Sequence, residues 1–212
     1  MPAAGLARRE RGVNHKVLLV RHAAVALRWR GRCYGSTDVG LSRDGMARSR
    51  DIAREILRRH DANEIGGVIH SGLRRARYLA ERIAEATGAD IRVDERWRER
   101  DFGMWETRTW TSIWRESGSA MDRMLTEPDS YRPGGGETTA ELFRRSVAAW
   151  KSLPRSSISV VVTHGGPIAC VRCHLAKAPI AGVAEFRIAE GRMVEIRRDC
   201  EKDGPVRTEV GS

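Results

Sequence analysis

Residues 16–23 constrain the fold more strongly than any other stretch of the sequence. Residues 17–20 form a short apolar run rich in valine, and Arg21 and His22 follow it directly. Such a run is typical of a strand that is buried on both faces of a sheet. Ligands of open α/β sheets bind at the carboxyl ends of the strands, so Arg21 and His22 are expected where chemistry usually takes place. Taken alone, the pair could equally be the solvated end of a strand.

A second run of the same kind, at residues 158–162, supports the first interpretation. It is nearly all β-branched and ends in Thr163, His164 and two glycines, and Pro167 suits the first turn of a following helix. Further strands are predicted at 68–70, 91–93, 184–188 and 193–196. Helices are predicted from a Ser42 cap to about residue 59, at 71–87, and after a capping box at 138–141. This alternation predicts a mostly parallel sheet with helices on both faces.

The length of 212 residues indicates one domain. We expect a flexible arm at 1–15, a domain at 16–198 with a small excursion near 105–137, and a polar tail at 199–212. No apolar run approaches the roughly 20 residues that span a bilayer, and the first fifteen residues lack the apolar segment of a secretory signal. These features predict a cytoplasmic protein without a membrane partner.

The formal charge of +10 raises the question of nucleic-acid binding. The basic residues are nearly all arginine, and most alternate with acids, as at 96–101. That pattern is typical of solvated helix faces with short ion pairs. Because no common nucleic-acid motif is present, we expect no specific nucleic-acid partner, although a preference for anionic substrates remains reasonable.

The cysteines are too few for a disulfide scaffold. Residues 170–174 match the C-x-x-C-H pattern of covalent haem attachment, but that chemistry needs export and the segment reads as a helix. A zinc site lacks a second pair of ligands at suitable spacing. Cys170 and Cys173 are therefore expected to be small buried residues on an apolar helix face.

Groups suited to phosphate chemistry follow the predicted strands. If the sheet is parallel, two imidazoles, two guanidiniums and one carboxylate meet along one edge. Guanidiniums bind phosphate oxygens bidentately, a neutral imidazole is a competent nucleophile, and a carboxylic acid can protonate a leaving oxygen. A metal cage is not expected, since the cations would repel a metal.

Five segments then resemble, in order, the motifs of the histidine phosphatase superfamily with its phosphoglycerate-mutase-like fold. Residues 19–23 resemble the Arg-His-Gly signature, and 71–76 resemble S-x-L-x-R-A, which selects Arg75 rather than Arg74. Residues 97–106 resemble L-x-E-x-x-F-G-x-W-E, 133–138 resemble P-G-G-E-S, and 163–166 match the second-histidine motif. The resemblance covers about residues 16–180 and implies a three-layer α/β/α sandwich with a mostly parallel central sheet.

The resemblance also implies the roles of the site residues. His22 attacks phosphorus and becomes phosphohistidine, and Glu99 protonates the leaving group and then assists water. The substrate, a small phosphorylated metabolite, is bound by Arg21, Arg75, His164 and Gly165, with Ser36 and Arg28 as further candidates. Arg28 stands where many relatives have Asn, and it can enter the phosphate pocket or, as we favour, point into water. Ala23 and Thr107 replace common glycines. No metal or organic cofactor is implied.

The resemblance leaves the exact reaction open. A short excursion favours net hydrolysis over phosphoglycerate-mutase-type transfer, and residues 31–42 resemble a loop common in α-ribazole phosphatases. A non-catalytic phosphoester-binding protein on the same scaffold is a further alternative, as is a basic nucleic-acid-binding module. The sequence does not settle the oligomeric state, and a homodimer is one option.

Four tryptophans lie at 97–114. Trp110 and Trp114 are one helical turn apart and are interpreted as a packing stripe. A tryptophan near Glu99, for which Trp105 is the candidate, could stack on an aromatic base.

Overall fold

A six-stranded sheet forms the centre of the molecule, in the order β3-β2-β4-β1-β5-β6. The computed structural model describes residues 15–155, 157–198 and 208–210. The strands are β1 (His15–Arg21), β2 (Ile65–His70), β3 (Ile91–Val93), β4 (Ile158–Thr163), β5 (Met193–Arg198) and β6 (Thr208–Val210). The first four run parallel, β5 runs antiparallel to β1, and β6 runs antiparallel to β5. The predicted mostly parallel sheet is therefore confirmed.

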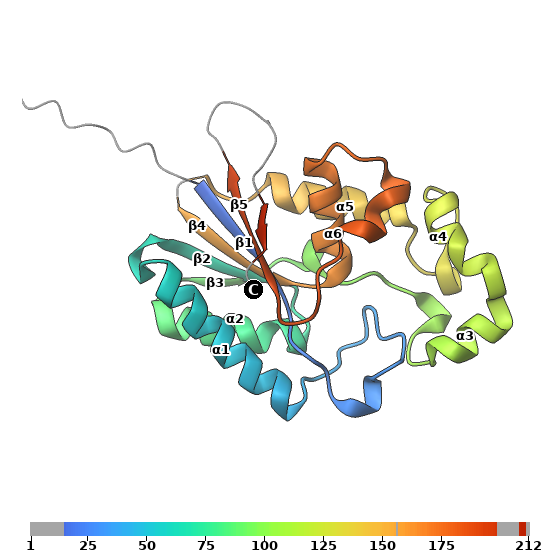
Figure 1. Cartoon of the computed structure of the whole chain (residues 1–212), viewed down its shortest axis with the longest axis horizontal. Coiled ribbons are helices and arrows are strands. Elements are labelled where there is room, and N and C mark those ends of the chain that lie inside the picture. The colour runs from blue at the N-terminus through green and yellow to red at the C-terminus, as the bar shows by residue number, and fades with distance from the viewer. Residues whose placement is uncertain (1–14, 156, 199–207, 211–212) are drawn as a thin grey trace, which may run out of the picture.

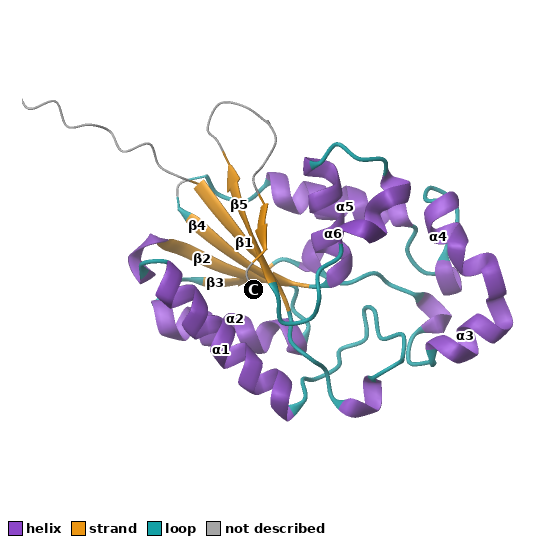
Figure 2. Cartoon of the chain, viewed as in Figure 1, coloured by secondary structure: helices purple, strands orange, loops and turns teal. Residues whose placement is uncertain are grey.

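Alternate residues of β1 and β4 enter two different hydrophobic cores. Leu18 and Val20 pack with residues of α1 (Arg43–Arg59) and α2 (Arg74–Thr87). Val17 and Leu19 pack with residues of α5 (Thr139–Lys151) and α6 (Gly165–Leu175). Figures 1 and 2 show these two helix pairs on opposite faces of the sheet. Both faces need apolar side chains, which is why the strands read as unbroken apolar runs, and the result is the expected three-layer sandwich.

The ends of two long helices follow the local sequence signals. Ser42 caps α1 by accepting a hydrogen bond from the Gly45 amide. Thr138 and Glu141 form a capping box at the start of α5, in which each side chain accepts a backbone N–H of the other end of the box. Each such cap is worth about 0.5–2 kcal/mol.

The helices α3 (Trp110–Ser117) and α4 (Arg123–Thr126) lie beside the sandwich, at the right of Figure 1. Four buried side chains, those of Cys33, Phe102, Trp105 and Ile113, form a small core under α3. The segment is thus held against the loop after β1, and its residues form one wall of a cavity that Arg100 and Gly166 also line.

One predicted strand is wrong. Residues 184–188, which alternate apolar and polar side chains, do not form a strand; a 3₁₀ helix spans Ile180–Phe186 instead. A helical turn lets Val183 and Phe186 pack against α6, in a core with Leu142 and Ala169. The place beside β1 that a strand here could have taken is occupied by β5.

Most of the predicted arm and tail lies outside the described residues, which include only His15 of the arm and 208–210 of the tail. Within the described part of the chain, no helix has the length and apolar character needed to cross a bilayer.

Candidate active site

His22 and His164 emerge side by side because they follow neighbouring parallel strands in register. Arg21, the last residue of β1, is paired with Thr163, the last residue of β4. The two rings that follow have centroids 5.1 Å apart and planes tilted by 58°. Both side chains are buried. The convergence that the sequence predicted for the two imidazoles is therefore present.

The surroundings of His22 fix its tautomer. Its Nδ1 lies 2.7 Å from the carbonyl oxygen of Ala23. A carbonyl only accepts hydrogen bonds, so Nδ1 carries the proton and Nε2 holds a lone pair. No hydrogen bond from the described residues engages Nε2. Burial, together with the charges of Arg75 and Arg21, lowers the pKa of His22 well below 6.5 despite the bond to Ala23. The ring is neutral at physiological pH, with a free nitrogen.

Arg75 is buried beside the His164 ring. Its Nε donates to Nδ1 of His164 (3.3 Å), Nη1 donates to the carbonyl of Thr37 (2.7 Å), and Nη2 donates to that of Gly35 (2.5 Å). These bonds use three of the five guanidinium donors, so two remain for a ligand. The neighbouring Arg74 is exposed and pairs with Asp38. The structure thus brings Arg75, and not Arg74, into the site.

His164 is oriented by Arg75 and Ser71. Because guanidinium nitrogens only donate, Nδ1 of His164 must be unprotonated, and the proton of the neutral ring is on Nε2. That nitrogen lies 2.8 Å from the hydroxyl oxygen of Ser71. Burial and the nearby Arg75 lower the pKa of His164 well below 6.5. Sequence reasoning did not include Ser71 among the site residues, although its place directly after β2, the strand beside β4, was a usable signal.

The Glu99 carboxylate lies at the amino-terminal end of α6. It accepts hydrogen bonds from the amides of Arg100 (3.0 Å) and Gly166 (3.2 Å to each oxygen). A Cβ at position 166 would overlap Oε1 of Glu99, so the site needs glycine there. Burial favours the neutral acid, but Arg187, these two amides and Arg21 outweigh it and lower the pKa of Glu99. Glu99 is therefore ionised in the ligand-free site.

Arg21 packs against Gly165. Nη1 of Arg21 donates to the carbonyl of Ile188 (2.6 Å), and Nη2 lies 3.8 Å from Glu190. Its Nε has no hydrogen-bond partner among the described residues. A Cβ at Gly165 would lie 3.2 Å from Cζ of Arg21, a tight contact. The glycine therefore permits the guanidinium to lie against the start of α6.

Ser36 takes part in holding the loop after β1. Its amide and hydroxyl both donate to Oε1 of Glu106, at 2.7 and 2.8 Å. The amide and hydroxyl of Thr37 and the amide of Phe102 donate to the same carboxylate. Glu106, which sequence reasoning left without a role, thus fixes the loop whose carbonyls bind Arg75. The substrate contact of Ser36 stays a prediction.

Arg28 lies on a short 3₁₀ helix, Leu27–Trp29, and its side chain is exposed. Its guanidinium lies over the ring of Trp29, 5.7 Å from the ring centroid. This agrees with the alternative in which Arg28 points into water.

A cavity of about 370 Å³ adjoins Glu99 through Gly166, Arg100 and Arg187. Trp105, the candidate for base stacking, packs in the small core under α3 and is only 8% exposed. Trp110 and Trp114 line the cavity instead. Trp110 also packs edge-on against Phe102, whereas Trp114 is 54% exposed, so the interpretation of both as a packing stripe holds only for Trp110.

The described residues contain no cluster of three or more histidine, cysteine or acidic side chains placed to hold a metal ion. Cys170 and Cys173 are free thiols buried on α6, as expected for small core residues. Cys200 lies outside the described residues.

Comparisons with known proteins identify the family of the chain. A model of the histidine phosphatase superfamily (branch 1) matches residues 17–209. The probable phosphoglycerate mutase GpmB of Escherichia fergusonii is 32% identical over 161 residues, which cover 74% of this chain and 72% of that protein. A mycobacterial glucosyl-3-phosphoglycerate phosphatase solved with inorganic phosphate superposes with a TM-score of 0.73 at 26% identity, over 93% of this chain and 95% of that one.

A putative α-ribazole-5′-P phosphatase of Escherichia coli K-12 gives a TM-score of 0.78 at 18% identity, over 92% of this chain and 95% of the other. At that identity the likeness concerns the fold alone.

Proposed function

The chain belongs to the histidine phosphatase superfamily, and from this premise we propose that it hydrolyses phosphomonoesters through a phosphohistidine at His22. One observation carries the proposal. The neutral His22 ring has an unengaged Nε2, and it lies 5.1 Å from the His164 ring within a cluster that also holds Arg75. A nucleophile and donors for phosphoryl oxygens thus meet at one point.

In the first half-reaction, Nε2 of His22 attacks phosphorus, and the bond from phosphorus to the leaving oxygen breaks. The free donors of Arg75, with Arg21, spread the negative charge of the transferring group. The Nε2–H of His164 is directed at Ser71, and its Nδ1 accepts from Arg75. We therefore assign His164 first to the positioning of Arg75. A direct contact between His164 and the phosphoryl group is a further proposal.

Glu99 must gain a proton before it can protonate the leaving oxygen. Its pKa is lowered in the free site by cations and amides, but a dianionic phosphoryl group beside it would raise that pKa. A monoanionic ester, whose second pKa is about 6, can bring the proton with it. After transfer to the leaving oxygen, the ionised Glu99 takes a proton from water as the water attacks the phosphohistidine. Inorganic phosphate leaves and His22 is regenerated.

Phosphoglycerate-mutase-type transfer is the second candidate, because relatives at 32–33% identity are named probable phosphoglycerate mutase. The mycobacterial phosphatase at 26% identity supports hydrolysis instead. The specific substrate that we propose to test first is α-ribazole 5′-phosphate, since residues 31–42 resemble the loop of α-ribazole phosphatases.

A single panel separates these candidates. The purified protein is incubated with p-nitrophenyl phosphate, α-ribazole 5′-phosphate or 3-phosphoglycerate, the last with and without 2,3-bisphosphoglycerate. We expect net release of inorganic phosphate. Conversion of 3- to 2-phosphoglycerate without phosphate release would establish a mutase. Tight vanadate binding without turnover of any ester would establish a non-catalytic phosphoester-binding protein. Equal, slow turnover of all three esters would remove the α-ribazole assignment.

A further inference from the structure

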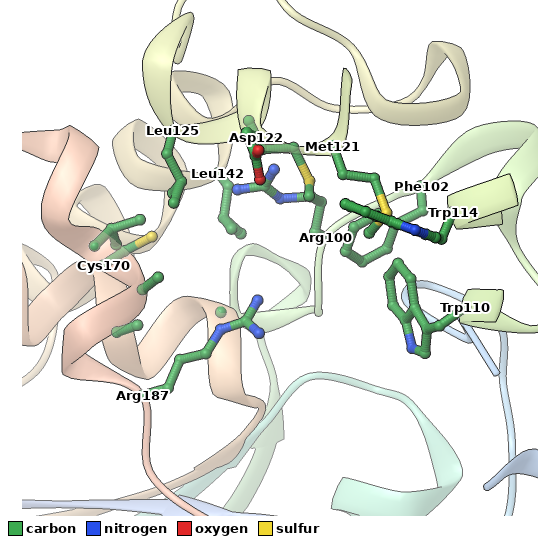
Figure 3. Close-up of a pocket in the computed structure, with 15 residues that line it drawn as sticks. Arg100, Phe102, Trp110, Trp114, Met121, Asp122, Leu125, Leu142, Cys170 and Arg187 are labelled. Carbon is green, nitrogen blue, oxygen red and sulfur yellow. The ribbon is translucent and has the colours of Figure 1, made fainter. Parts of the chain in front are cut away.

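The cavity beside Glu99 has apolar walls on two sides. Figure 3 shows Phe102, Trp110 and Trp114 on one side and Leu125, Leu142 and Cys170 on the other. Its volume of about 370 Å³ lies within the range of small-molecule sites. Such walls favour a bulky apolar group, and aromatic rings above all. A small polar leaving group such as glycerate would leave this surface uncovered.

Two arginines supply positive charge to the same cavity. The guanidinium of Arg187 points into the space between the apolar walls (Figure 3), and its side chain is exposed. Arg100 is 6% exposed; it donates to Oγ1 of Thr139 at 3.0 Å, and its Nη1 has no hydrogen-bond partner among the described residues. Within the described part of the chain, no carboxylate lies in ion-pair range of either guanidinium. The acids nearby are Asp122, exposed on the cavity lining, and Glu99.

The guanidiniums of Arg100 and Arg187, which have no carboxylate partner among the described residues, are suited to bind an anionic group of a ligand. A charge-assisted contact to a guanidinium is stronger in the cavity than in water, because the surroundings are less polarisable. Glu99 interacts electrostatically with both guanidiniums but does not line the cavity, and we assign it to proton transfer. Asp122 lines the cavity, but neither carboxylate is ion-paired with Arg100 or Arg187, so these guanidiniums can take an anionic group of a ligand.

Resting on the proposed phosphatase activity, we propose that the preferred substrate has an apolar ring system as its leaving group and a second anionic group, such as a carboxylate, on that ring. The phosphoryl group lies at His22, the ring lies between Trp114 and Leu142, and the carboxylate pairs with Arg187. Arg187 is then a specificity-determining residue, and Arg100 adds positive potential from beneath.

The test uses pairs of aryl phosphates with and without a carboxylate, whose leaving groups have similar pKa values. The pairs are 2-naphthyl and 6-carboxy-2-naphthyl phosphate, and phenyl and 4-carboxyphenyl phosphate; 3-phosphoglycerate supplies a carboxylate without a ring. We expect kcat/KM for carboxynaphthyl phosphate to exceed that for naphthyl phosphate by about tenfold or more, and to exceed that for 3-phosphoglycerate by a larger factor.

Variants separate charge from ring packing. In Arg187→Met the carboxynaphthyl-to-naphthyl ratio should fall to about one, and because it is a ratio, any effect of Arg187 on Glu99 cancels. In Trp114→Ala both naphthyl esters should lose about tenfold relative to phenyl phosphate. Arg58→Met, which removes an exposed charge from α1, is the matched control and should leave both ratios unchanged.

Failure of this inference and failure of the proposed function give different results. Turnover of p-nitrophenyl phosphate with a carboxylate ratio of one or less, or α-ribazole 5′-phosphate turned over faster than every carboxylate ester, would overturn the inference and leave the phosphatase. If no ester is turned over, quenching of tryptophan fluorescence by 6-hydroxy-2-naphthoate still tests the cavity. Binding that Arg187→Met weakens about tenfold would support the inference; binding that it leaves unchanged, or no binding, would overturn it.

Discussion

The Nε–H of Arg75 donates to Nδ1 of His164 across 3.3 Å and ties a guanidinium to the second imidazole of the site. Only an arginine can hold this bond together with those to the carbonyls of Gly35 and Thr37 and still have donors left for a phosphoryl group. The position of this one side chain therefore depends on β4, on α2 and on the loop after β1 at once.

Arg75→Lys should damage the enzyme although it conserves charge. An ammonium group cannot make the three directed contacts, so we expect kcat/KM for p-nitrophenyl phosphate to fall by about 10²–10³. The matched variant Arg74→Lys changes an exposed residue and should stay within about threefold. Equal losses in the two variants would contradict the assignment of Arg75.

Glu99→Gln should slow the release of poor leaving groups. An amide cannot donate a proton to the leaving oxygen, and we expect kcat for an alkyl phosphate to fall by about 10²–10⁴. The loss should be smaller for p-nitrophenyl phosphate, whose leaving group needs no proton. Glu95→Gln, at an exposed acid paired with Arg98, is the control. A uniform loss across leaving groups would argue against proton donation by Glu99.

Glu106→Gln should loosen the loop that holds Arg75. The amide keeps one acceptor oxygen where the carboxylate accepts bonds from Ser36, Thr37 and Phe102. We expect the free energy of unfolding to fall by about 1–3 kcal/mol, and kcat/KM to fall by about tenfold as the carbonyl partners of Arg75 shift. Urea titrations and steady-state assays measure the two effects. A variant that unfolds and reacts like the parent would show that Glu106 does not position Arg75.

Stability should fall as the pH drops below about 6.5. Burial lowers the pKa of His22 and of His164 well below 6.5 in the folded protein. Below pH 6.5 the unfolded chain therefore binds more protons than the folded one, and the free energy of unfolding decreases by up to about 1.4 kcal/mol per pH unit for each ring. Urea titrations between pH 5 and 8 measure the slope. Burial also lowers the pKa of His60 and of His70, so four rings contribute to the slope. His164→Asn should reduce it by up to the contribution of one ring, about 1.4 kcal/mol per pH unit; a slope unchanged by this variant would contradict burial of the neutral ring.

Much of the fold and the centre of the site could be predicted from the sequence. The two apolar runs at 17–20 and 158–162 are apolar because both faces of the sheet are buried. Since the carboxyl ends of parallel neighbouring strands meet at one edge of the sheet, His22 is expected beside His164. Arg75 was selected over Arg74 by resemblance to a family motif, because both arginines are chemically able to bind phosphate.

Side-chain hydrogen bonds between residues far apart in the chain could not be predicted from the sequence. The hydrogen bond between Ser71 and His164 spans 93 positions, and that between Ser36 and Glu106 spans 70. The segment at 184–188 has strand-like alternation, yet its packing against α6 decides for a 3₁₀ helix. Arg187 follows this 3₁₀ helix and lines the cavity. Because the sequence predicted a strand at 184–188, it did not indicate that Arg187 lies there. Thr107, which replaces a glycine common in the family, keeps the left-handed backbone (φ of 69°) that glycine favours.

The nucleophilic role of His22 is tested most directly by trapping the phosphoenzyme. The enzyme is mixed with a ³²P-labelled monoester, quenched in alkali within milliseconds and mapped by peptide mass spectrometry. We predict one acid-labile, alkali-stable phosphoryl group on His22, formed before steady state and absent from His22→Ala, which should also lose activity. Full activity in His22→Ala, or a label on any other residue, would contradict the account.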